Sequence, residues 1–121
     1  MSGKSQKYTS KQRANDRMKQ LTSAENLDDF VSKNGYSLLF FSASWCGPCQ
    51  TMKPVVAGVA NMMSDRFNTI RLDVDESPQA AVDYGVRSVP TLMLVKDNQV
   101  VAQHVGTVPP QELIQWLNQR V

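Results

Sequence analysis

The two cysteines are the residues best suited to chemistry, because only two residues separate them in the segment Trp45-Cys46-Gly47-Pro48-Cys49. Apolar residues recur every three or four positions after this segment, which predicts that the pair stands at the start of a helix. Residues three apart on a helix are neighbours, so the sulfurs can form and break a disulfide with little backbone motion. The N–H groups and dipole at a helix N-terminus favour the thiolate, the attacking form of cysteine. We therefore expect Cys46 to be the nucleophile and Cys49, one turn further in, to resolve the mixed disulfide.

Two alternatives to thiol–disulfide exchange stay open for this pair. The cysteines could be structural, although a disulfide over so short a loop removes little entropy from the unfolded chain. They could also form half of a zinc or iron–sulfur site, but zinc usually takes four ligands. The single histidine, His104, falls on a distant predicted strand at an expected surface position, so such a metal would be shared between two chains. We expect no metal site, and we assign the six methionines mainly to the core.

Length and charge indicate one domain preceded by a basic segment. The chain has 121 residues, the usual size of one domain, with 13 basic and 11 acidic side chains. Residues 1–20 hold six of the basic side chains and one acidic one, whereas the remainder is mildly acidic. We expect a basic polar tail over residues 1–17 and one folded domain over residues 18–121. Such a tail can touch an anionic partner, but it lacks the interleaved aromatic residues expected of a nucleic-acid reader.

Hydropathy favours a protein without a membrane span or a secretory leader. The longest unbroken apolar runs, Leu38–Phe41 and Leu92–Val95, have four residues each, whereas a span needs about 20. The first seven residues are polar and basic, with no apolar stretch after them. We therefore expect a protein of the reducing cytoplasm, with no membrane partner.

The apolar pattern predicts an α/β fold. After a strand that ends at Leu21, the predicted strands are residues 36–42, 67–74, 91–95 and 100–105. Residues 36–42 are apolar on both faces, which is typical of a central strand covered by helices on both sides. The last two strands are expected to form a hairpin, with Asn98 in its turn at positive φ. Helices separate the earlier strands, so these are predicted to pair in parallel and the hairpin to add antiparallel strands.

Four helices are predicted between and after these strands. The first is expected to be capped by Thr22 or Ser23, to end at Asn34-Gly35, and to bury Leu27, Phe30 and Val31. The second starts near Pro48, is kinked at Pro54, and buries Met52, Val55, Val56, Val59, Met62 and Met63. The third helix is expected to bury Ala81, Val82 and Tyr84. The fourth is expected to bury Leu113, Ile114 and Leu117.

From about residue 18 to residue 121 the chain resembles the thioredoxin family. The resemblance is carried by Trp45-Cys46-Gly47-Pro48-Cys49, then Pro54, Asp73-Val74-Asp75, Tyr84-Gly85-Val86, Ser88-Val89-Pro90-Thr91 and Gly106. A lone Cys-x-x-Cys would be weak evidence, whereas this ordered set is highly specific. The resemblance implies a thioredoxin fold, a central five-stranded mixed sheet flanked by four helices.

The same resemblance implies how substrates bind. Pro90 is expected to follow a cis peptide bond and to face the disulfide, which presents the backbone of Val89 to a substrate strand. Independently of the resemblance, Trp45 directly precedes Cys46 and is expected to shield the sulfurs and to offer a flat apolar surface to a substrate chain. The docking surface implied by the resemblance comprises Trp45, Gly47, Pro48, Val74, Val89, Pro90, Val105 and Gly106.

Three departures from the family pattern bear on the proton of Cys49. The family usually places a buried aspartate where this chain has Phe40, and often a lysine where it has Arg71. A tryptophan typical of the family is replaced by Ser42. We therefore expect slower resolution near neutral pH, and faster turnover below pH 7 in Phe40→Asp, unless water that passes Ser42 takes the proton.

These observations predict a thiol–disulfide oxidoreductase that reduces protein disulfides and serves cell redox homeostasis. The expected redox group is the Cys46–Cys49 disulfide, with no other cofactor. We expect disulfide-containing protein substrates, a flavoprotein reductase that re-reduces the pair, a monomer, and no nucleic-acid partner. The alternative is a binding module that docks a partner through the apolar patch around Trp45 and Pro90, with the basic tail adding contacts. Cys46→Ser should abolish reduction but leave such binding intact.

Overall fold

The computed structural model describes residues 18–21, 27–31 and 35–121. Its elements in chain order are β1 (Met18–Leu21), the 3-10 helix η2 (Leu27–Asp29), β2 (Tyr36–Ser42), α2 (Gly47–Met62), β3 (Phe67–Asp73), α3 (Pro78–Asp83), β4 (Thr91–Lys96), β5 (Gln99–Val105) and α4 (Pro110–Asn118). The expected tail over residues 1–17, the expected caps Thr22 and Ser23, and Asn34 at the expected end of the first helix lie outside the described residues.

The strands form one mixed sheet in the order β1-β3-β2-β4-β5. β3 pairs in parallel with β1 and with β2, whereas β4 pairs antiparallel with β2 and with β5. β2 is therefore the central strand, and every residue from Ser37 to Ser42 is buried. The predicted α/β class, the central strand and the parallel and antiparallel pairs are confirmed.

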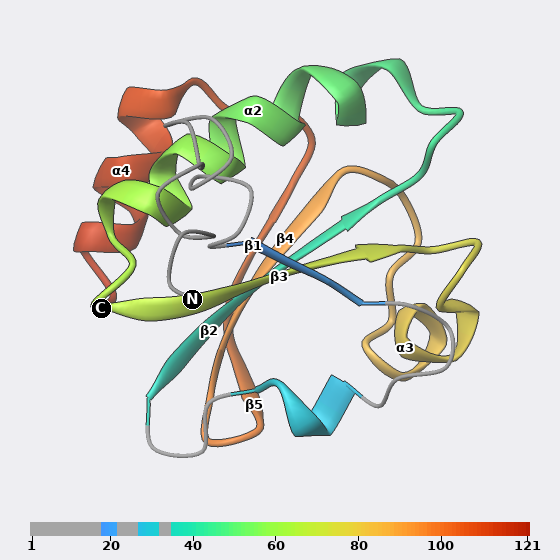
Figure 1. The fold of residues 1–121 in the computed structure, drawn as a ribbon, viewed down its shortest axis with the longest axis horizontal. Helices are drawn as coiled ribbons and strands as arrows, with labels where there is room; N and C mark the ends of the chain where they lie inside the picture. Colours follow the sequence, from blue (N-terminus) through green and yellow to red (C-terminus); the bar gives the residue numbers. More distant parts are fainter. Residues whose placement is uncertain (1–17, 22–26, 32–34) are drawn as a thin grey trace, which may run out of the picture.

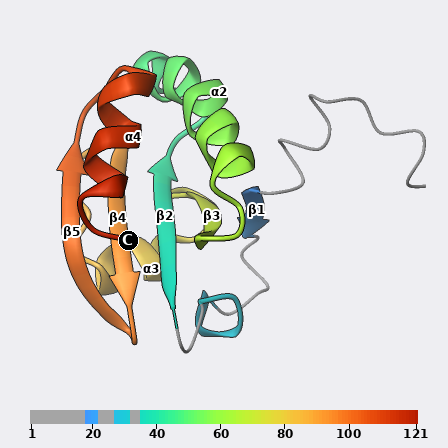
Figure 2. The same ribbon diagram turned by 90° about the vertical axis from the view of Figure 1, so that its left-hand side faces the viewer.

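Helices cover both faces of the sheet, so alternate residues of β2 enter two different cores. Leu38 and Phe40 pack in a cluster with residues of α2 and α4. Leu39 and Phe41 pack in a second cluster, to which η2 and α3 contribute. Figure 1 shows α2 and α4 on one side of the sheet and α3 and η2 on the other, and Figure 2 shows the strands side by side from β5 to β1. The start of α2 thereby lies over the end of the central strand.

The expected helix count needs correction. The described residues contain three α-helices and one 3-10 helix rather than four α-helices. In the region of the first predicted helix, the N–H groups of Phe30 and Val31 bond to the oxygen of Leu27. Leu27 and Val31 are buried as expected, and Phe30 packs partly buried beside them.

Two expected core residues are instead exposed, Met62 at 67% and Val82 at 72%. Their neighbours in sequence, Met63 and Ala81, are buried. Successive residues of an α-helix are rotated by about 100°, so Met62 and Val82 point away from the core-facing stripe. The rest of the α2 stripe is buried or partly buried, and Pro54 lies inside the helix.

The turn between β4 and β5 has the predicted backbone chemistry. Asn98 has φ of 67° and Asp97 has φ of 53°, the left-handed conformations of a two-residue hairpin turn. β5 begins at Gln99, one residue before its predicted start, and it forms the edge of the sheet.

Candidate active site

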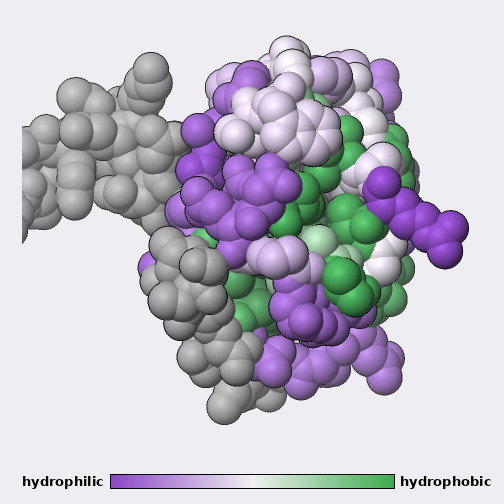
Figure 3. Space-filling view, turned by 90° about the vertical axis from the view of Figure 1, so that its right-hand side faces the viewer, coloured by the Kyte–Doolittle hydropathy of each residue, from purple (hydrophilic) through white to green (hydrophobic). Residues whose placement is uncertain are grey.

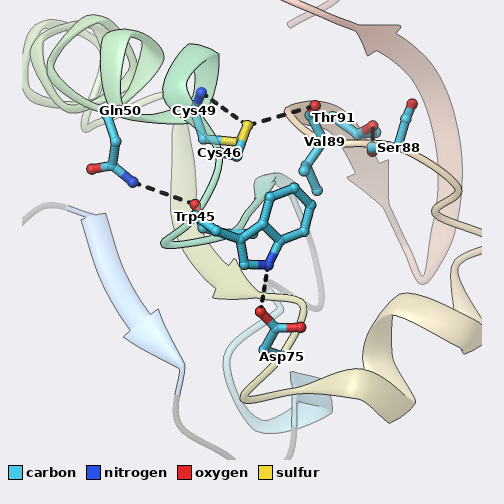
Figure 4. The surroundings of a disulfide bond; sticks show 9 residues. Trp45, Cys46, Cys49, Gln50, Asp75, Ser88, Val89 and Thr91 are labelled. Carbon is cyan, nitrogen blue, oxygen red and sulfur yellow. Dashed lines mark hydrogen bonds between the residues drawn. A yellow bond between two sulfur atoms is a disulfide. The ribbon is translucent and has the colours of Figure 1, made fainter.

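The cysteine pair stands at the first turn of α2. Cys46 is the N-cap residue, with φ of −94° and ψ of 112°, and Pro48 lies in the first turn, where its missing N–H breaks no helical hydrogen bond. Cys46 and Cys49 form a disulfide, with their Cα atoms 5.2 Å apart. The N–H of Cys49 donates to Cys46 Sγ at 3.2 Å (Figure 4). Cys46 is 7% exposed and Cys49 only 1%, so the first cysteine is the more accessible.

An apolar wall adjoins the disulfide. Ala43 packs against the two cysteines, and Val74 and Val89, both partly buried, pack against the same cluster. Cys46 Sγ lies 3.8 Å from the backbone oxygen of Val89 (Figure 4). The Val89–Pro90 peptide bond is cis, as the resemblance implies.

The end of β5 completes this side of the site. The N–H of Gly106 donates to the oxygen of Pro90 at 2.9 Å, and Gly106 has φ of 97°, which favours glycine. Val105 pairs with Thr91 in the β4–β5 ladder and is about half exposed. Val105 and Gly106 therefore lie next to Pro90, although the whole β4–β5 hairpin separates them from it in sequence.

Trp45 is held at the edge of the site by a residue to which the sequence assigned no role. Its indole is 70% exposed, and its Nε1–H donates to Asp75 Oδ2 at 2.7 Å (Figure 4). Asp75 follows β3, which runs parallel to β2. Neighbouring parallel strands have their C-terminal ends at the same end of the sheet, so the residues that follow them lie close together. The position of Asp75 just after β3 was therefore the sequence signal that could have placed it near Trp45.

The predicted docking residues lie on the face that carries these strand ends. Gly47 and Pro48 are exposed, Val74 and Val89 are partly buried, and Pro90 is buried. Figure 3 shows hydrophobic atoms set among hydrophilic ones on this side of the molecule. Apolar and polar side chains thus lie next to one another around these strand ends.

A polar cavity of about 350 Å³ adjoins Cys49 on another side. It is lined by Gln20, Ser42, Ala43, Ser44, Cys49, Gln50, Lys53, Arg71, Asp73 and Glu76. Burial lowers the pKa of the Arg71 guanidinium below its usual value, and the nearby carboxylates of Asp73 and Glu76 oppose that shift. Sequence reasoning considered Ser42 and Arg71 but missed the two carboxylates.

Phe40 is fully buried, in register with Arg71 on the neighbouring strand. It belongs to the apolar cluster between the sheet and α2, together with Met52 and Val56. The aromatic ring therefore contributes to the core beneath the helix that carries the cysteines.

No metal-binding group of three or more His, Cys, Asp or Glu side chains occurs within residues 18–21, 27–31 and 35–121. His104 lies on the edge strand β5, with Nε2 3.3 Å from the oxygen of Thr107. In the same described part of the chain, no helix combines the length and hydropathy needed to cross a bilayer.

A disulfide between residues three apart at a helix N-terminus, set at the end of a mixed sheet beside a cis proline, defines a dithiol–disulfide exchange protein. The thioredoxin family model matches residues 18–119. Thioredoxin from Rhodospirillum rubrum is 36% identical over 104 residues, which cover 86% of this chain and 100% of that protein. Thioredoxin 1 from Synechococcus elongatus is 43% identical over 84 residues, which cover 69% of this chain and 78% of that protein. The chain belongs to the thioredoxin family.

A solved structure gives the same assignment. A mutant thioredoxin from Halobacterium salinarum NRC-1 superposes with a TM-score of 0.76 at 36% identity, over 86% of this chain and 90% of that one. The protein is therefore a protein-disulfide oxidoreductase, and its redox group is the Cys46–Cys49 disulfide. The thioredoxin relatives favour this activity over the binding-module alternative.

Proposed function

We propose that the protein reduces disulfides of other proteins, with Cys46 as the attacking nucleophile and Cys49 as the resolving thiol. The observation that carries these roles is the N-cap position of Cys46, whose sulfur accepts the N–H of Cys49 at 3.2 Å. A backbone N–H and the helix dipole both favour the thiolate over the thiol at this sulfur. Cys49 is less accessible and lacks the N-cap position.

The exchange has two steps. The Cys46 thiolate attacks one sulfur of the substrate disulfide, forms a mixed disulfide and releases the other substrate sulfur as a thiolate, which takes a proton from solvent. Cys49 then loses its proton and attacks Cys46 Sγ. The Cys46–Cys49 bond forms, and the second substrate sulfur leaves. Two electrons pass from the dithiol to the substrate.

The backbone of Val89 supports a mode of substrate binding. Its oxygen lies 3.8 Å from Cys46 Sγ, so an extended chain that pairs with Val89 brings its own sulfur close to the nucleophile. Trp45, Gly47, Pro48, Val74, Pro90, Val105 and Gly106 form the apolar surface for the flanking side chains. We further infer a cytoplasmic location, where a flavoprotein reductase re-reduces the pair.

The test is turbidimetric reduction of insulin with dithiothreitol or a reductase as electron donor. Cys46→Ser should abolish the activity, because no nucleophile remains. Cys49→Ser should abolish turnover and, when mixed with the substrate after dithiothreitol has been removed, accumulate a mixed disulfide between Cys46 and the substrate, which non-reducing electrophoresis detects. Accumulation of the mixed disulfide on Cys49 in Cys46→Ser, with none on Cys46 in Cys49→Ser, would reverse the assigned roles.

A further inference from the structure

In the resolving role that we propose for it, Cys49 must lose its proton. Because this thiol is buried, another group has to receive the proton, and the inference below rests on that role. The side chain of Cys49 is 1% exposed. Within its hydrophobic cluster, Ala43, Val74 and Val89 cannot accept a proton. Phe40, beneath α2, cannot do so either.

The polar cavity of about 350 Å³ is lined by Cys49 together with charged residues. It lies between the first turns of α2, which supply Cys49, Gln50 and Lys53, and the sheet, which supplies Gln20, Ser42, Arg71 and Asp73. Ser42 and Asp73 are direct partners in the β2–β3 register, so their side chains lie on the same face. Some residues of the cavity wall are exposed, so the cavity is open to solvent. It is large and polar enough to hold water.

Four ionisable side chains other than Cys49 line this cavity: Lys53 from α2, Arg71 and Asp73 from β3, and Glu76 from the following turn. Lys53 and Arg71 are cations and cannot act as the base. The carboxylate of Asp73 is oriented by the turn, because its Oδ1 accepts the N–H of Asp75 at 2.8 Å and that of Glu76 at 3.4 Å. Its other oxygen, Oδ2, has no hydrogen-bond partner among the described residues. Glu76 is exposed, and nothing in the described part of the chain anchors its carboxylate in this way.

We propose that Asp73 is the positioning residue that receives, through water in this cavity, the proton of Cys49 during resolution. The S–H bond of Cys49 breaks as water takes the proton and passes a proton to the Asp73 carboxylate. The Cys49 thiolate then attacks Cys46 Sγ, so the intramolecular disulfide forms as the bond to the substrate sulfur breaks. The substrate leaves as a thiolate, and Asp73 returns its proton to solvent.

The test separates the two steps of exchange. Reduced protein is mixed in a stopped-flow instrument with dithiobis-nitrobenzoate, an aromatic disulfide that releases a coloured thiolate. Attack by Cys46 releases one coloured thiolate at a rate that depends on reagent concentration, and resolution by Cys49 releases a second at a rate that does not. Asp73→Asn keeps an oxygen for the two backbone N–H groups but removes the base.

We expect Asp73→Asn to slow the second phase about tenfold at pH 7, with the first phase within about twofold of the wild-type rate. The loss should shrink as pH rises, because hydroxide can then accept the proton. Formate should restore the second phase in proportion to its concentration, since it is small enough to enter the cavity. Glu76→Gln is the matched control, because it removes the other carboxylate of the same wall, and its second phase should stay near the wild-type rate.

An unchanged second phase and pH profile in Asp73→Asn would overturn the inference, as would equal slowing of both phases or a larger effect of Glu76→Gln. Ser42→Leu provides an independent variant, because it fills part of the cavity and leaves the Asp73 carboxylate in the chain, and it should also slow only the second phase. If Asp73→Asn fails to fold, a normal second phase in Ser42→Leu overturns the inference. Absence of the second phase in the wild-type protein would instead contradict the role proposed for Cys49.

Discussion

The indole N–H of Trp45 donates a hydrogen bond to Asp75 Oδ2 at 2.7 Å, which joins the residue before the nucleophile to the turn after β3. The two residues are 30 positions apart in sequence. The bond fixes the orientation of a ring that is otherwise 70% exposed. Its acceptor therefore controls the orientation of the largest side chain in the docking surface that we propose.

Asp75→Ala should release the ring and weaken the reduction of protein disulfides. A hydrogen bond contributes about 0.5–1.5 kcal/mol, which corresponds to a loss of about two- to tenfold in kcat/KM for insulin. The rate with a small aromatic disulfide should change less, because it makes few contacts with the surface. Asp75→Asn, which retains an oxygen acceptor, serves as the control. Equal losses with both substrates would contradict a docking role for Trp45.

The orientation of the ring can be measured separately by fluorescence. The chain has two tryptophans, so Trp116→Phe leaves Trp45 as the only indole. In this background, Asp75→Ala should shift the emission of Trp45 and lower its fluorescence anisotropy, because the side chain gains rotamer freedom. Unchanged emission and anisotropy would show that other contacts hold the ring.

Phe40→Asp should destabilise the fold, and this loss of stability should outweigh any gain in proton transfer. Phe40 is fully buried in the cluster formed with α2, and removal of a buried aromatic ring alone costs about 3–5 kcal/mol. An aspartate adds the cost of placing a carboxylate in an apolar core. Urea denaturation should therefore show a much lower free energy of unfolding at pH 7, with a partial recovery at acidic pH, where the carboxyl is neutral.

Phe40→Leu is the control for that prediction, since it keeps an apolar side chain and should lose less stability. If Phe40→Asp retained wild-type stability at pH 7, the site would tolerate a charged group. The faster turnover below pH 7 that the sequence predicts for this variant would then be testable directly.

Tyr84 should make the fold less stable at alkaline pH. Burial raises the pKa of its phenol above the usual value of 10.0, and the negative charges of Asp28 and Asp83 raise it further. The folded protein thus binds the phenolic proton more tightly than the unfolded chain does. Its contribution to stability is fully present below about pH 10 and is lost as pH rises from there through the folded-state pKa.

Tyr84→Phe keeps the ring, whose centroid lies 6.0 Å from that of Phe41, and removes the ionisable group. The free energy of unfolding, measured with urea on the oxidised protein, should fall less steeply in Tyr84→Phe than in wild type between about pH 9 and about pH 11. Parallel pH profiles for the two proteins would show that the phenol does not ionise differently in the folded and unfolded states.

Local sequence patterns were sufficient for most of the fold. The residues of Leu38–Phe41 are apolar on both faces of the strand, and they identified a central strand. Only a strand covered on both faces can bury consecutive apolar side chains. The predicted turn at Asn98 was confirmed because its positive φ depends on residues adjacent in sequence. Met62 and Val82 were wrongly predicted to be core residues, because the apolar character of a residue does not show which face of its helix packs against the sheet.

The sequence by itself determined the cysteine pair, its place before a helix and the α/β class, since each depends on residues close together in the chain. Only the tertiary structure decided which distant groups surround the pair. The bond from Trp45 to Asp75, the contact of Cys46 with Val89, and the cavity that links Cys49 to Asp73 all arise where β2, β3 and the turn before β4 meet. Their geometry depends on strand order and register, which are set by how the separate elements pack into common cores.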